Sequence, residues 1–201
     1  MDAAKIRLST EEEALIQRSD WILTKNDIIV KVKQLLESLQ SRQSELLQPL
    51  FHRFPAIAGY HGKVSKGENY RGLPYLVLDH PRCFDKDGIL AIRTMFWWGQ
   101  FFSVTLHIDG LYKSQLAEKL VRSFKALQQA GFYTCIHAEP WQYHFERDNY
   151  HPLEEMNADE FSKQLSGHSF IKIAGKIPLT PWNEAGSRMI ALFSELVNAM
   201  D

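Results

Sequence analysis

Residues 91–110 read AIRTMFWWGQFFSVTLHIDG, a block of aromatic and β-branched residues broken in its middle by Gly99. Phe, Trp, Val, Ile and Thr favour pleated strands, and a glycine between two such runs predicts the turn of a β-hairpin. With a three-residue loop over residues 98–100, Trp97 pairs with Phe101. The block therefore predicts a hairpin at the centre of the fold.

This register gives the hairpin two different faces. A two-residue loop would shift the pairing by one position and mix the two faces, so we favour the three-residue loop. One face is apolar and is expected to lie under helices: Leu90, Ile92, Thr94, Phe96, Phe102, Val104, Leu106 and Ile108. The other face mixes aromatic and polar side chains: Ala91, Arg93, Met95, Trp97, Phe101, Ser103, Thr105 and His107.

The rest of the chain alternates helical and extended patterns. Helical spacing, capping residues and Pro or Gly stops predict helices at 10–18, 26–47, 113–130, from 157, and 180–199. Apolar runs predict strands at 75–79, 132–136, 141–145 and 170–177, whereas the glycine-rich stretch 59–72 predicts an irregular loop. Thr10 and Glu13 match a capping box, and Pro81 is expected to end the strand at 75–79.

Strands that follow one another without intervening helices favour antiparallel pairing, which predicts an α+β fold. We expect a mainly antiparallel sheet of about six strands packed against amphipathic helices, with an N-terminal helical pair and a long C-terminal helix. Residues 1–201 are expected to form one domain, with the helical segment 1–50 packed on it.

Composition excludes some classes of partner. The chain has 23 Lys and Arg against 24 Asp and Glu, which argues against a nucleic-acid or anionic-membrane binder. No run approaches the roughly 18 apolar residues of a membrane span. The polar start at 1–17 lacks the apolar core of a signal peptide, and Cys83 and Cys135 form no CxxC motif. These features predict a reduced, cytoplasmic protein that binds neither nucleic acid nor membrane.

The mixed face of the hairpin is the first candidate site. Aromatic walls with a few polar groups are typical of small-molecule sites, and Arg93 offers a fixed fork for a carboxylate or phosphate. The candidate ligand-binding residues are Arg93, Trp97, Phe101, Ser103, Thr105 and His107, with Tyr70 and Arg71 as a lid from the glycine-rich loop. Alternatively, this face is the solvated side of the sheet or the interface of a homodimer.

The second candidate site is a set of metal-binding residue types. A hairpin over 132–145 would bring Cys135 opposite His144, near His137 and Glu146, as the start of a zinc or iron site. The spacing matches no metal-binding signature, so solvent-facing polar residues are the favoured explanation and a metal site is the alternative. Asp79 and His80 are adjacent on a strand and point to opposite faces, so they are not expected to act as a dyad.

The leading hypothesis is a protein that binds a small ligand on the aromatic sheet face, without an identified catalytic residue, cofactor or metal. One alternative is a metal-assisted hydrolase or transferase that uses the Cys/His residues. The other is a protein-interaction module that dimerises through the aromatic face. No motif connects the chain to a particular family.

Overall fold

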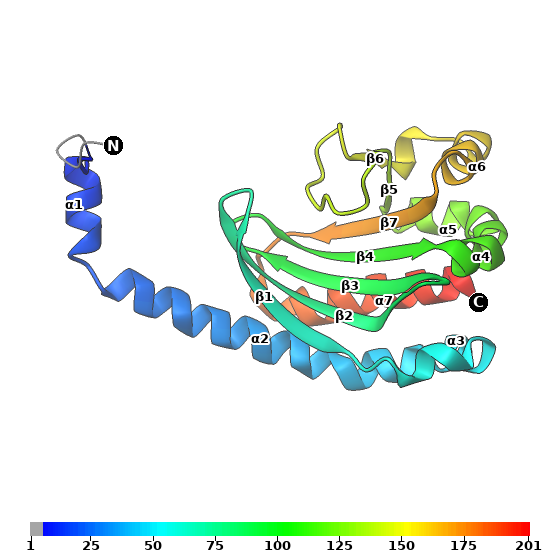
Figure 1. Cartoon of the computed structure of the whole chain (residues 1–201), viewed down its shortest axis with the longest axis horizontal. Helices are drawn as coiled ribbons and strands as arrows, with labels where there is room; N and C mark the ends of the chain where they lie inside the picture. Colours follow the sequence, from blue (N-terminus) through cyan, green and yellow to red (C-terminus); the bar gives the residue numbers. More distant parts are fainter. Residues whose placement is uncertain (1–5) are drawn as a thin grey trace.

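The computed structural model describes residues 6–201, so residues 1–5 of the expected helical segment and of the polar start lie outside it. Its centre is a seven-stranded sheet with the order β1-β2-β3-β4-β7-β5-β6, in which every pairing is antiparallel (Figure 1). The strands are β1 (Lys63–Tyr70), β2 (Leu73–Asp85), β3 (Gly88–Trp97), β4 (Phe101–Asp109), β5 (Tyr133–Cys135), β6 (Tyr150–Pro152) and β7 (Phe170–Ile177).

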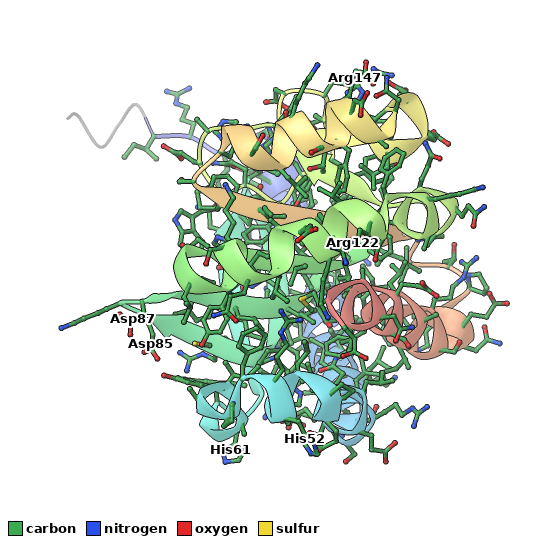
Figure 2. The ribbon with its side chains drawn as sticks, turned by 90° about the vertical axis from the view of Figure 1, so that its right-hand side faces the viewer. His52, His61, Asp85, Asp87, Arg122 and Arg147 are labelled. Atoms are coloured by element: carbon green, nitrogen blue, oxygen red, sulfur yellow. The ribbon has the colours of Figure 1, made fainter. Side chains whose placement is uncertain are left out.

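Helices cover one face of this sheet, except for α1, which extends away from it (Figure 1). The helices are α1 (Thr10–Ile16), α2 (Asp20–Leu46), α3 (Gln48–Arg53), α4 (Gly110–Arg122), α5 (Phe124–Gln129), α6 (Ala158–Gly167) and α7 (Ala185–Met200). Figure 2 shows α7 between α4, which ends at Arg122, and α3, which carries His52. None of the helices that the structure describes combines the length and apolarity that crossing a bilayer requires.

The predicted α+β architecture and the central hairpin are confirmed. Trp97 pairs with Phe101, and the register continues without a break to Leu90 and Ile108. The apolar face of β3 and β4, which includes Ile92 and Leu106, is buried against α2, α4 and α7, and α7 contributes Phe193 to the contact. Because each such side chain contributes about 1.5–3 kcal/mol on burial, this layer is the main source of stability.

Several helices begin or end at residues other than the predicted ones. The capping box of α1 is formed by Ser9 and Glu12, one residue earlier than predicted. α2 begins at Asp20 rather than at Asn26. The helix predicted at 113–130 is divided at Ser123 into α4 and α5, and the last helix begins at Ala185 after a short 3₁₀ turn.

The strands around the glycine-rich stretch differ more from the prediction than the helices do. β1 pairs with β2 where an irregular loop was predicted. β2 also continues past Pro81, because the pairing with β3 is interrupted by a bulge between Asp79 and Arg82. A bulge leaves residues unpaired, and so it accommodates a proline that has no N–H to donate to the ladder.

The prediction of a strand at 141–145 is wrong. Residues 136–149, called here the covering segment, contain no strand, and the partner of β5 is β6 instead. The segment crosses the face of the sheet opposite α7 (Figure 1). Asn149 anchors its end, because its side-chain amide donates to the carbonyl of His144 and its side-chain oxygen accepts from Cys135 Sγ.

Candidate functional site

The mixed face of the hairpin points toward the covering segment. Ser103, Thr105 and His107 are buried on β4, and Trp97 is buried against Tyr70 and Phe101. The alternative of a solvated sheet face is therefore wrong, since the chain itself occupies this face. The polar groups lie in a closed layer between the sheet and residues 136–149.

Arg93 already has a carboxylate partner in this layer. Its Nε and Nη2 donate to the two carboxylate oxygens of Asp79 at 2.7 and 2.8 Å, and its Nη1 donates to Tyr143 Oη at 2.7 Å. Burial acts to lower the pKa of Arg93, but the bonds and attraction to Asp79 outweigh it and the net shift is upward. The fork that was predicted to hold a ligand is thus occupied by Asp79.

Lys172 of β7 is the functional candidate that the sequence analysis missed. It pairs with His107 of β4 and is only 2% exposed. Its Nζ donates to the backbone carbonyl of Gln142 and lies 4.2 Å from the ring centre of Tyr143. Among residues 6–201 no carboxylate lies within ion-pair distance of Lys172. Burial lowers the pKa of Lys172 to about 7, and this effect outweighs the opposite influence of Cys135, while Arg93 adds a smaller lowering.

His107 lies beside this lysine and is uncharged at neutral pH. Burial, together with repulsion from Lys172 and Arg93, lowers the pKa of His107 to about 4. Its ring packs edge-on against Trp141 and Phe170. Within the described part of the chain, its buried Nε2 has no hydrogen-bond partner, and the same holds for Ser103 Oγ and Tyr150 Oη.

We use the name polar chamber for the space enclosed by the sheet and the covering segment around Asp79, Arg93, Thr105, His107, Tyr143 and Lys172. It contains a cavity of about 10 Å³ that all of these except Lys172 line, together with Phe84 and Ala91. That volume corresponds to about one water molecule. Trp141 is half-exposed and packs against Phe84 and His107, which places it at the chamber's edge. A larger groove of about 650 Å³ lies between α4 and α6, away from these buried charges.

Tyr70 and Arg71, predicted to form a lid, instead hold the covering segment. Tyr70 Oη accepts hydrogen bonds from the backbone N–H of Tyr143 at 2.7 Å and of His144 at 3.2 Å. Arg71 forms an ion pair with Glu146 at 2.5 Å. The element that would have to move for a ligand to enter is the covering segment, while Tyr70 and Arg71 are its attachment points.

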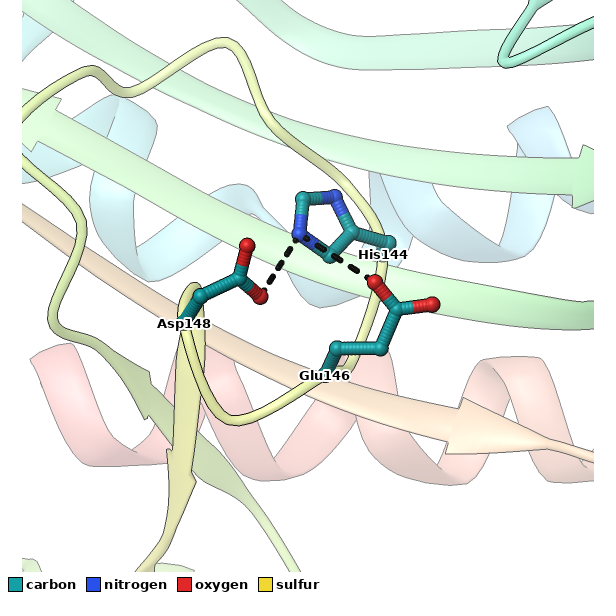
Figure 3. Close-up of side chains that lie close together, drawn as sticks. All are labelled: His144, Glu146 and Asp148. Carbon is teal, nitrogen blue, oxygen red and sulfur yellow. Dashed lines mark hydrogen bonds and ion pairs between the residues drawn. The ribbon is translucent and has the colours of Figure 1, made fainter.

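The predicted Cys/His cluster does not form in the described part of the chain. Cys135 pairs with Tyr150 and donates to Asn149, and His137 Nδ1 accepts from the backbone N–H of Glu139. A different group does converge: His144 Nε2 lies 3.1 Å from Asp148 Oδ1 and 3.7 Å from Glu146 Oε2 (Figure 3).

His144, Glu146 and Asp148 are the residues that could hold a cation, since one ligand atom from each lies within 4.8 Å of the others. Other side chains of this protein already contact the same residues. Arg71 offsets the charge of Glu146, and Tyr70 Oη lies 3.1 Å from His144 Nδ1. The geometry of this group is therefore explained without an ion.

The comparisons with known proteins leave the geometry as the guide to function. No family model and no curated protein match the sequence. In the described part of the chain, the polar chamber is where three buried or partly buried charged groups, Arg93, Asp79 and Lys172, lie close to the unpartnered Nε2 of His107.

Proposed function

We propose that the protein binds a small anion in the polar chamber, beneath the covering segment. The observation that carries this proposal is Lys172, a buried cation whose only hydrogen-bond partner among the described residues is a backbone carbonyl. Removing an ammonium group from water is costly unless an opposite charge is close. A bound anion would offset that cost, so the chamber favours anions over neutral molecules.

The balance of charge in the chamber supports the same proposal. Asp79 neutralises Arg93, which leaves Lys172 as the excess positive charge. His107 Nε2, Ser103 Oγ and Tyr150 Oη add buried polar atoms without partners in the same layer of the described chain. Buried polar groups are nearly always hydrogen-bonded, so the Nε2 of His107, which lines the cavity and has no partner in the described chain, favours a ligand that bonds to it.

The size of the cavity limits which anions can bind without a change in structure. The cavity accommodates about one water molecule, so an anion of several atoms must displace part of the covering segment. The contact of Lys172 with the carbonyl of Gln142 is the bond that an incoming carboxylate or phosphate would replace. Trp141, which packs against His107 at the chamber's edge, belongs to the segment that would be displaced. A carboxylate or an inorganic oxyanion fits these conditions best.

The two alternatives have less support. A metal-assisted hydrolase or transferase would need the cysteine and histidines together, whereas Cys135 lies apart from His144 and bonds to Asn149. An interface through the aromatic face would need Trp97 at the surface, whereas it is buried under the protein's own chain. Anion binding uses residues that are already together.

A thermal-shift screen tests the proposal. The panel contains formate, acetate, phosphate and sulfate, with Zn²⁺ and a chelator as separate arms. The variants are Lys172→Met and the matched control Lys176→Met, which removes an exposed lysine four residues further along β7, on the same face of the sheet.

An anion at 100 times its Kd stabilises the native state by about 2.7 kcal/mol, which for a chain of this size raises Tm by roughly 5–10 °C. We expect this shift in the unmodified protein and in Lys176→Met, and its loss in Lys172→Met. No shift with any anion, or an equal shift in Lys172→Met, would overturn the proposal. A shift with Zn²⁺ alone, reversed by the chelator, would instead support the metal alternative.

A further inference from the structure

Residues 6–30, called here the N-terminal arm, comprise α1 and the first part of α2. In Figure 1 the arm extends away from the sheet, with α1 at the far end of α2 from α3. Most of the large apolar side chains that the described residues expose belong to the arm: Ile6, Leu8, Leu15, Ile16, Trp21, Ile22, Leu23 and Val30. Exposed apolar surface gathered in one place indicates an interaction site.

The arm also lacks internal sources of stability. α1 has seven residues and none of them is buried, although isolated helices shorter than about 12–15 residues are marginal in water. Trp21, Ile22 and Leu23 follow one another at about 100° around α2, so they cover more than half of its circumference there, with Asp20 and Thr24 on the remaining side. An apolar surface of this width on a helix normally packs against other apolar groups. Leu23 is nevertheless 60% exposed and Val30 is 54% exposed.

We propose that the arm pairs with the arm of a second copy of this chain, antiparallel, about a two-fold axis near Ile22. The charges identify the partner. α1 carries Glu11–Glu13, and α2 carries Lys31 and Lys33 on either side of the buried Val32. The acidic and basic groups are centred ten residues before and ten residues after Ile22. An antiparallel pair therefore places the acidic group of each copy beside the basic group of the other.

The same alignment matches apolar side chains. Leu15 and Ile16 of one copy lie beside the exposed Val30 of the other, next to Ile28 and Ile29, which pack on the core of their own copy. Trp21 meets Leu23 at the axis. Two residues lie between α1 and the N-cap of α2, and this non-helical link lets α1 follow the partner's α2. Every contact occurs twice in such a pair, so the interface closes as a dimer.

The mass of the full chain in solution, by size-exclusion chromatography with light scattering, tests the apolar part of the interface. We expect twice the chain mass of 23.3 kDa for the unmodified protein. The double variant Leu23→Glu with Val30→Glu is expected to run as a monomer, while Leu111→Glu, which changes an exposed leucine on α4, is expected to remain a dimer. Circular dichroism of each variant checks that the fold is retained.

A charge swap tests the alignment itself. One variant carries Glu11→Lys and Glu13→Lys, and the other carries Lys31→Glu and Lys33→Glu. Each variant alone places like charges together, so we expect at least about a tenfold weaker dimer. Mixed in equal amounts, the two variants have complementary charges at both ends and are expected to form a mixed dimer of near-normal affinity.

Three results would overturn the proposal. The first is an unmodified chain that is monomeric at every concentration; if that monomer also floats with lipid vesicles, the arm belongs to a membrane surface instead. The second is a Leu23 and Val30 double variant that remains a dimer. The third is a failure of the two charge variants to recover affinity on mixing, which would contradict the antiparallel alignment.

Discussion

Replacing Lys172 with methionine is expected to remove a specific pH dependence of stability. The folded protein holds the pKa of Lys172 at about 7, well below its ordinary value of 10.5, because the ammonium group is buried. Between these two values the unfolded chain binds a proton that the folded protein does not. Stability therefore rises with pH over this window, and the contribution is lost as pH falls toward 7.

The magnitude follows from the two pKa values. A tenfold change in proton affinity corresponds to about 1.4 kcal/mol, so between pH 7 and pH 9 the lysine makes the protein more stable by about 2 kcal/mol. At pH 7 the burial of Lys172 costs about 4 kcal/mol, from the same linkage. The methionine variant loses this cost but leaves the carbonyl of Gln142 without a donor, at about 1–3 kcal/mol. Its net stability at pH 7 is expected to rise by about 1–3 kcal/mol.

Urea unfolding at pH 7, 8 and 9 measures both quantities. The change of unfolding free energy with pH is compared between the unmodified protein and Lys172→Met, so that all other titrating groups cancel. Lys176→Met again serves as the matched control and should keep the slope of the unmodified protein. Equal slopes for the unmodified protein and Lys172→Met would show that Lys172 is not a desolvated cation.

Other substitutions have expected outcomes of their own. Asp79→Asn leaves Arg93 without its carboxylate and is expected to lower the unfolding free energy in urea by about 3 kcal/mol; no loss would contradict the role of this pair. Tyr70→Phe removes the acceptor for two backbone N–H groups of the covering segment, so the amides of Tyr143 and His144 should exchange hydrogen about tenfold faster; unchanged exchange would show that Tyr70 does not hold the segment. Burial raises the pKa of Cys135, and both cysteines are free and buried, so Ellman's reagent is expected to label them only on unfolding; fast labelling of the native protein would refute this.

The central hairpin could be predicted because its residues alternate strictly. Ile92 and Leu106 face helices while Arg93 and Thr105 face the other way, and a shift by one position would bury the wrong set. The strand Phe170–Ile177 and the helix capped by Asn157 follow from equally local signals. In each case the residues that decide the structure are close together in the sequence.

The strand β1 was missed for the opposite reason. It lies at the edge of the sheet and is largely exposed, so its sequence KVSKGENY lacks the apolar alternation of a buried strand. Exposed edge strands are commonly polar and carry lysine, which limits pairing with other chains. A glycine-rich polar stretch therefore has the pattern of a loop although it forms eight residues of strand.

The candidate site was predicted in part. The residues of the β3–β4 face are together as expected, but the segment that covers them has no periodic pattern and was expected to be a strand. Lys172 acquires its role from Gln142 and Tyr143, about thirty residues earlier in the chain. A single lysine among the apolar residues at the start of the strand FIKIAGKI was the available signal. Its burial depends on tertiary contacts that the local sequence does not contain.

The pKa of Lys172, measured with and without anion, provides the decisive evidence for or against an anion site in the polar chamber. Selective ¹³C labelling of the lysine Cε allows its chemical shift to be followed across the pH range, with Lys172→Met identifying the signal. We expect a pKa of about 7 in the free protein. The second measurement uses a saturating concentration of the anion that gives the largest thermal shift. There we expect the proton affinity of Lys172 to increase at least about tenfold, and its pKa to rise accordingly, because the anion favours the charged lysine. An ordinary lysine pKa without ligand, or a pKa that no anion changes, would contradict an anion site in the polar chamber.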